Sequence, residues 1–192
     1  MAGHGHAADH GGNKGIALLI SILALFLAIA ETGAKSAQTE ALSRNIEAAN
    51  LWAFFQARTI RQTTVQTAGE MMELGRAMVE EAAHQAAMQR QLERWRERVA
   101  RWESEPETGE GRRELMARAR AAEARRDKAI DAYGKYELAS AAFQIAIVLA
   151  SASIITSVPL LAVLAGVIGV GGFGLGVLAY FPDIHVPHLP LY

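Results

Sequence analysis

The longest apolar stretch of the chain lies near its C-terminus. No Asp, Glu, Lys or Arg occurs from Leu138 to Phe181, which is roughly twice the length that one helix needs to cross a bilayer. Pro159 is the natural point of division, because proline cannot continue a helix. The pattern predicts transmembrane helices over 139–157 and 160–181, followed by a tail at 182–192. A buried soluble helical pair is the alternative, but the rest of the chain offers too few apolar partners.

A second apolar run, at 16–30, is shorter than a usual membrane span. With its flanks it predicts a transmembrane helix over 15–33, after a flexible His-rich leader at 1–14. Ala28-Ile29-Ala30 also spells a small-x-small cleavage site, so a cleaved signal peptide is the alternative. Lys14 is the only Lys or Arg before the run. Because this is a poor signal-peptide n-region, the membrane anchor is favoured.

Basic residues gather between the first and second apolar segments. Since short loops rich in Lys and Arg stay in the cytoplasm, this bias predicts a cytoplasmic middle region and an N-terminus outside. The bias is carried by Lys35 and Arg44 after the first span and by Arg125, Arg126, Lys128 and Lys135 before the second.

The charged middle region has a helical pattern with one strong turn signal. Pro106, within ESEPETGEG at 103–111, predicts a turn. On either side of it, apolar residues recur at alternating steps of three and four, which predicts an antiparallel coiled-coil hairpin over 67–138. The predicted seam contains Met71, Leu74, Met78, Met88, Leu92, Trp95, Val99 and Trp102 before the turn, and Leu115 and Tyr133 after it.

The two arms of such a hairpin should match in length, since both begin at the same membrane face. One helix from 34 to 103 would be more than twice as long as a return arm at 112–138. The weak helix formers in RQTTVQTAGE at 61–70 are therefore expected to break it. Residues 34–66 then form an interfacial or connecting helix. Its aromatic residues either anchor it at the membrane surface or contact neighbouring helices: Trp52, Phe54 and Phe55.

Composition and charge argue against several classes of function. A net charge of −1 gives no electrostatic attraction to nucleic acid, and the interleaved charges of RQLERWRER at 90–98 indicate a solvated surface. The absence of cysteine excludes disulfides and thiol catalysis. No catalytic triad, carboxylate pair or phosphate loop can be assembled. We therefore expect no enzymatic activity, no cofactor and no nucleic-acid partner.

Two weak candidate sites remain. The leader histidines His4, His6 and His10 are close enough in sequence to converge on a metal. If Met1 is removed, Ala2-Gly3-His4 offers a free amine, two amides and an imidazole to square-planar Cu(II) or Ni(II). Glu31 and Lys35 lie four residues apart, in the favourable order for a helical ion pair. At the membrane edge that pair would be structural or would mark an ion path.

Glycines crowd the last apolar segment. GVGGFG at 169–174 matches a dinucleotide-binding spelling, but no strand precedes it and no acidic residue follows about twenty positions on. Small residues one turn apart instead predict a helix-packing face, expected to support assembly between copies. It comprises Ala162, Ala165, Gly166, Gly169, Gly172 and Gly176.

Residues directly after the first span resemble a known family. The runs KSAQTEAL at 35–42 and LWAFFQARTIRQ at 51–62 are similar to those of a bacterial membrane-protein family catalogued as domain of unknown function 4337. The order of one span, a charged helical middle and an apolar pair also agrees. The resemblance implies a bacterial inner-membrane location and brings no activity, substrate or catalytic residue.

Together these patterns predict an all-α multi-pass membrane protein: an N-terminal transmembrane helix, a cytoplasmic antiparallel coiled-coil hairpin and a C-terminal transmembrane helical pair. The expected function is that of a non-enzymatic, homo-oligomeric scaffold or assembly factor. Its expected partners are the lipid bilayer, further copies of the chain and a protein held by the hairpin. The alternative is a small ion or solute channel formed by oligomerised spans.

Overall fold

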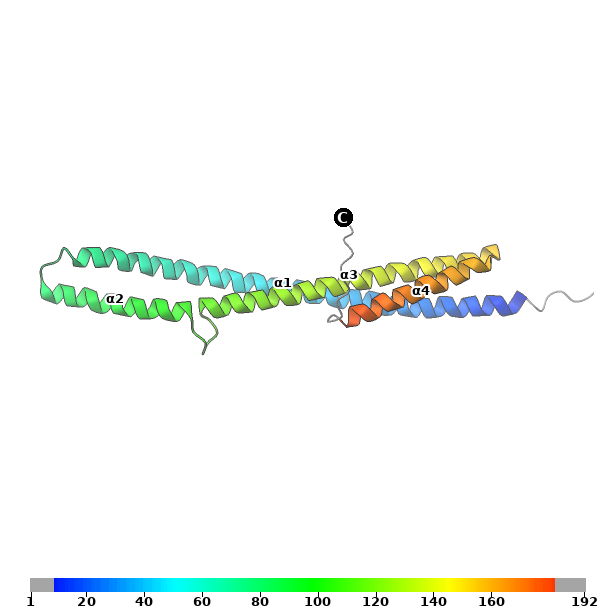
Figure 1. Ribbon diagram of the computed structural model, residues 1–192, viewed down its shortest axis with the longest axis horizontal. Coiled ribbons are helices and arrows are strands. Elements are labelled where there is room, and N and C mark those ends of the chain that lie inside the picture. Colours follow the sequence, from blue (N-terminus) through cyan, green and yellow to red (C-terminus); the bar gives the residue numbers. More distant parts are fainter. Residues whose placement is uncertain (1–8, 182–192) are drawn as a thin grey trace, which may run out of the picture. The chain divides into compact units, whose positions relative to one another are not determined.

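The structure is a computed structural model that describes the backbone of residues 9–181 and the side chains of residues 14–181. These residues form four helices, α1 (Asp9–Arg76), α2 (Ala82–Glu103), α3 (Arg112–Thr156) and α4 (Pro159–Tyr180) (Figure 1). They divide into two compact units. Unit 1 contains residues 1–42 and 127–192, and unit 2 contains residues 43–126. Both α1 and α3 contribute to each unit.

Helix α1 continues without a break through residues 61–70, so the break expected there is a wrong prediction. The hydroxyl groups of Thr59, Thr63 and Thr64 donate to the carbonyl oxygens four residues earlier, at 2.9, 3.0 and 2.9 Å. Threonine is a poor helix former partly because its hydroxyl competes with the helical backbone bonds. Here each hydroxyl donates to a carbonyl oxygen of the helix itself, so it does not draw the backbone into a non-helical conformation.

The chain reverses at residues 77–81, between α1 and α2, and not at 103–111. Within unit 2, Arg76 donates to Gln89, Arg96 lies beside Glu73, and Gln62 donates to Glu103. Further along, Trp52 donates to Glu123 of α3. Residues with lower numbers in α1 therefore contact residues with higher numbers in α2 and then in α3. Both helices run antiparallel to α1 (Figure 1).

The expected pairing of 67–103 with 112–138 is thus corrected. Within unit 2, α2 and then α3 share the return along α1. The segment at 104–111 is a loop between two helices that run in the same direction.

Unit 2 has a small core in which α3 packs on α1. Leu115, Ala119 and Ala122 of α3 are buried against Ala48 and Leu51. Trp52 and Phe55 pack against the same cluster, and their rings meet edge to face with centroids 5.4 Å apart. Of the two roles left open for these aromatic residues, contact with neighbouring helices is the one observed for Trp52 and Phe55.

Unit 1 is a three-helix bundle with a core rich in alanine. Leu23 and Ala30 of α1 are buried with Phe143 and Ala146 of α3 and with Ala165 of α4. Helix α3 ends at Thr156 and α4 begins at Pro159, so the helix break falls at the point where the proline suggested it. Ser157 between them has a φ of 56°, and Ser153 donates to the carbonyl oxygen of Val158 at 2.9 Å.

Candidate functional site

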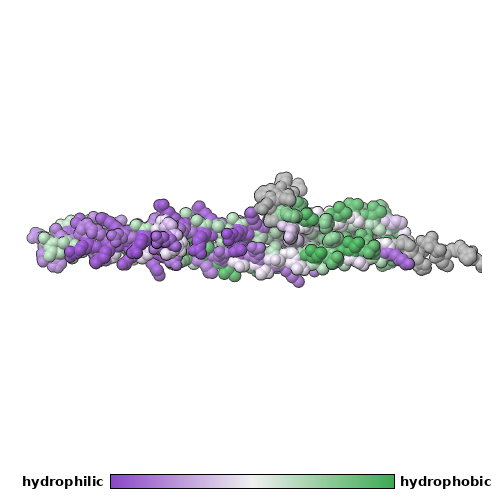
Figure 2. Space-filling model, turned by 90° about the horizontal axis from the view of Figure 1, so that it is seen from below, coloured by the Kyte–Doolittle hydropathy of each residue, from purple (hydrophilic) through white to green (hydrophobic). Residues whose placement is uncertain are grey.

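The surface of unit 1 is apolar. Three helices in the described part of the chain are long and apolar enough to cross a membrane, and no more than 33% of the apolar segment of any of them is buried. Figure 2 shows hydrophobic residues over the helices of unit 1 and mainly hydrophilic residues over those of unit 2. Since large exposed apolar surfaces mark interaction or membrane contact, the bilayer is the environment that fits unit 1.

The small residues of α4 do not form a single packing face. Ala165, Gly169 and Gly172 are buried, and a Cβ atom on Gly172 would lie 3.1 Å from Ala142 Cβ and 3.3 Å from the carbonyl oxygen of Ala139. A Cβ atom on Gly166 or Gly176 would meet nothing within 4 Å.

Gly172 therefore allows close approach of α3 in the same chain. The close packing that the sequence pattern predicts is present, and it joins helices within one chain. Ala162 is half-buried.

An apolar pocket of about 230 Å³ lies in unit 1 beside the aromatic residues of its three helices. Phe26 of α1 stacks on Phe143 of α3 with ring centroids 5.9 Å apart and meets Phe173 of α4 edge to face at 5.1 Å. Tyr136 lies against Gly33. These contacts tie the three helices together around the pocket.

The predicted seam residues fall into two groups. Leu92 and Leu115 are buried, while Met88, Val99, Trp102 and Tyr133 are half-buried. Met88 packs near Gly75, and Leu92 and half-buried Trp95 pack near Gly69. These residues of α2 therefore face α1, and not α3 as the sequence suggested.

The second group lies at the end of α1 and beyond, where the prediction is wrong. Met71, Leu74 and Met78 are 69%, 70% and 86% exposed. Helix α1 turns its smaller residues, Gly69 and Gly75, toward α2, and this places the three large apolar side chains on the outside.

These exposed residues belong to a longer stripe. Ile46 and Ile60 are 61% and 67% exposed, and Ile46, Ile60 and Leu74 are spaced two heptads apart. We call the set the α1 stripe; its large members are Ile46, Ile60, Met71, Leu74 and Met78. Sequence reasoning found its second half and assigned it to the wrong partner.

The expected pair of Glu31 and Lys35 is not formed. Both side chains are exposed, and no ion pair joins them among residues 14–181. Exposed pairs gain little free energy, because solvent screens them and holding two long side chains costs entropy. The leader histidines His4, His6 and His10 lie outside the part of the chain whose side chains are described. Among the described side chains, no group of three His, Cys, Asp or Glu residues has the geometry to hold a metal.

Among the described carboxylates outside the apolar segments, Glu103 has the most strongly shifted pKa. It accepts hydrogen bonds from Arg112 at 3.0 Å, Arg113 at 3.1 Å and Gln62 at 3.3 Å. These donors, Arg112 above all, lower the pKa of Glu103 from 4.5 to about 2. These hydrogen bonds join α1, α2 and α3 at the point where the loop at 104–111 leaves α2. Their role is structural.

The described chain is thus all-helical, with three helices suited to span a membrane and a second, largely hydrophilic helical unit. Residues 12–182 match the model of the family described as domain of unknown function 4337, and the chain belongs to this family. The comparisons with curated proteins and with solved structures gave no match.

Proposed function

We propose that this protein is a non-enzymatic membrane scaffold that self-associates through the α1 stripe. The observation that carries the proposal is the exposure of Met71 and Leu74 near the end of α1, whose opposite face is already packed, and of Met78 in the turn that follows. Large apolar side chains on a hydrophilic unit favour burial against a partner. Unit 1 holds the chain in the membrane. We also propose that unit 2 lies in the bacterial cytoplasm.

The spacing of the stripe supports a second copy as the partner. In a heptad that places Met71 at an a position, Ile46, Ile60 and Leu74 of α1 fall at d positions. Asn50 falls at an a position and is exposed. A polar Asn at one a position fixes register in parallel dimers, because it pairs with its counterpart.

Anchoring in one membrane supports the same arrangement. Copies held in a bilayer with the same orientation present α1 in parallel, so identical residues meet. Confinement to the membrane also raises the effective concentration of one copy around another. Both effects favour a parallel homodimer, or a higher parallel oligomer, over capture of an unrelated helix.

Cysteine crosslinking tests the proposal, because the chain contains no native cysteine. Ile60→Cys and Leu74→Cys are expected to give disulfide-linked dimers when the full-length protein is oxidised in liposomes. Gln66→Cys is the matched control, since Gln66 is exposed on the same helix but points away from the stripe. Native mass spectrometry should show an oligomer that Leu74→Glu weakens at least tenfold.

A monomer at every concentration, or equal crosslinking at Gln66 and Leu74, would overturn the proposed surface. Ion flux through liposomes separates the scaffold from the channel alternative. A current that disappears in Glu31→Gln would favour a channel formed by the spans, because Glu31 is the carboxylate at the end of the first apolar run.

A further inference from the structure

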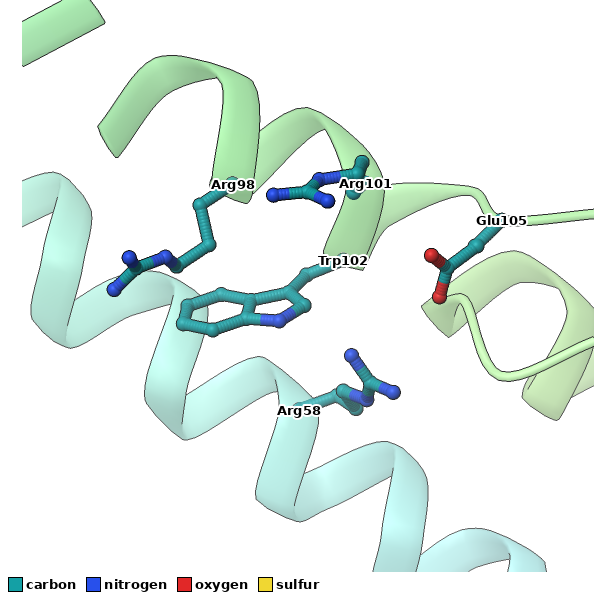
Figure 3. A pocket seen from close by; sticks show the side chains of 5 residues that line it. All are labelled: Arg58, Arg98, Arg101, Trp102 and Glu105. Atoms are coloured by element: carbon teal, nitrogen blue, oxygen red, sulfur yellow. The ribbon is translucent and has the colours of Figure 1, made fainter. Parts of the chain in front are cut away.

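A cationic cleft lies in unit 2, where α1 passes the end of α2. Its volume is about 380 Å³, and it is lined by Arg58 of α1, by Arg98, Arg101 and Trp102 of α2, and by Glu105 of the following loop. Figure 3 shows the indole of Trp102 between the side chains of Arg98 and Arg101 on one side and Arg58 on the other. Three guanidinium groups thus surround one cleft, with one carboxylate at its edge.

Arg58 forms the floor of the cleft and is only 9% exposed. Its Nη2 donates to Glu110 Oε2 at 2.8 Å, and its guanidinium lies 5.4 Å from the centroid of the Phe54 ring. Its Nε is buried and has no hydrogen-bond partner in the part of the chain that the structure describes. Because an unmatched buried donor is costly, this arginine has unused capacity to bind an anion.

Arg98 and Arg101 supply the exposed wall of the cleft. They lie three residues apart on α2, and within residues 14–181 neither makes an ion pair or a side-chain hydrogen bond. Some other arginines of the unit are engaged, such as Arg96 with Glu73 and Arg112 with Glu103. The two free guanidinium groups repel each other, so an anion between them would lower the energy of both.

The remaining lining residues complete the site. Trp102 is half-buried, and its indole N–H has no acceptor among the described side chains, so it is one more donor. The carboxylate of Glu105 is held by the hydroxyl of Thr108 at 2.9 Å. Glu105, together with the Glu110 carboxylate that is paired with Arg58, offsets two of the three cationic charges and leaves a net charge of +1 at the cleft.

We propose that this cleft binds the phosphate group of a small soluble molecule. Arginine suits this ligand, because its planar fork donates two parallel hydrogen bonds to phosphate oxygens. All arginines of the chain lie between Arg44 and Arg126, an interval without lysine. The lining contains no aliphatic side chain to hold an acyl chain, so a soluble phosphate fits better than a lipid headgroup.

Calorimetric titration of the full-length protein in detergent tests this inference, with inorganic phosphate and diphosphate as probes. Saturable binding is expected, and the double variant Arg98→Gln/Arg101→Gln should weaken it at least tenfold. The control is Arg90→Gln/Arg94→Gln, which removes the same charge from exposed positions on the same helix and should change affinity less than twofold. Arg58→Lys keeps the charge but loses the planar fork and should weaken binding several-fold.

Absence of saturable binding would overturn the site. An equal loss in both double variants would also overturn it, because the effect would then be general electrostatics. Tighter binding of dihexanoyl phosphatidic acid than of diphosphate would replace the soluble ligand by a lipid headgroup. Circular dichroism of each variant confirms that loss of binding is not loss of fold.

Discussion

The last residue of α2 is hydrogen-bonded to the first residue of α3: Arg112 Nε lies 3.0 Å from Glu103 Oε2. The loop at 104–111 therefore leaves and returns to the same place, and α2 and α3 are held end to end beside α1. Arg113 and Gln62 donate to the same carboxylate. A hairpin turn would have placed α2 and α3 side by side; this junction lets them continue in one direction.

Acidification should weaken this junction. The pKa of Glu103 is lowered to about 2 by Arg112, Arg113 and Gln62, so its stabilisation is fully present above the unfolded pKa and is lost as the pH falls from about 4.5 toward 2. Glu103→Gln should cost about 1–2 kcal/mol at pH 7, reduced from the full charged-bond value by solvent screening. Thermal unfolding followed by circular dichroism measures this.

The control for this prediction is Glu97→Gln, an exposed carboxylate on the same helix, which should leave the melting temperature nearly unchanged. The difference between wild type and Glu103→Gln should shrink between pH 4.5 and pH 2. A difference that stays constant over that range would contradict the role of the charged carboxylate.

Gly172→Leu should disturb the packing of α4 on α3. A Cβ atom alone would already lie 3.1 Å from Ala142 Cβ and 3.3 Å from Phe143 Cε1, so the larger side chain should cost about 1–3 kcal/mol through overpacking. Gly174→Leu is the control, because its Cβ would meet nothing within 4 Å. Unfolding in detergent compares the two, and equal stability of both variants would argue against the observed packing.

The hydrogen bond from Trp52 Nε1 to Glu123 Oε1, 2.9 Å long, should couple α1 to α3 in unit 2. A double-mutant cycle of Trp52→Phe and Glu123→Ala isolates the bond, because each substitution removes one of its two partners. We expect a coupling of about 1 kcal/mol, since hydrogen bonds to charged groups exceed neutral ones but this pair is only partly buried. Strictly additive effects of the two substitutions would show that the bond contributes nothing.

Gly111→Ala should destabilise the α2–α3 junction. Gly111 is buried, and a Cβ atom there would lie 2.8 Å from Ser104 Cα, which is backbone and cannot move aside easily. We expect a loss of about 1–3 kcal/mol. Gly134→Ala, in the interior of α3 with open space around its Cβ, should instead raise stability by about 0.5–1 kcal/mol, because alanine is the better helix former. Differential scanning calorimetry of both variants checks the opposite signs.

The apolar helices, the division at Pro159 and a loop around Pro106 could all be predicted from the sequence. Each depends on a local property: a run without charge, a residue that cannot continue a helix, or a cluster of turn formers. The packing of α2 on α1, the cationic cleft and the reversal at 77–81 could not be predicted from the sequence. No Gly or Pro marks residues 77–81, and Arg58 reaches the cleft from a position far from Arg98 in the chain.

The physical reason is that α1 carries two heptad stripes. One contains Leu51 and Gly69 and packs inside unit 2; the other contains Met71 and Leu74 and is exposed. Periodicity reveals both stripes but does not say which one faces the other helices of the chain. Only tertiary packing decides this, because the smaller residues allow α2 to approach closely, and the larger apolar residues are then left on the outside of α1.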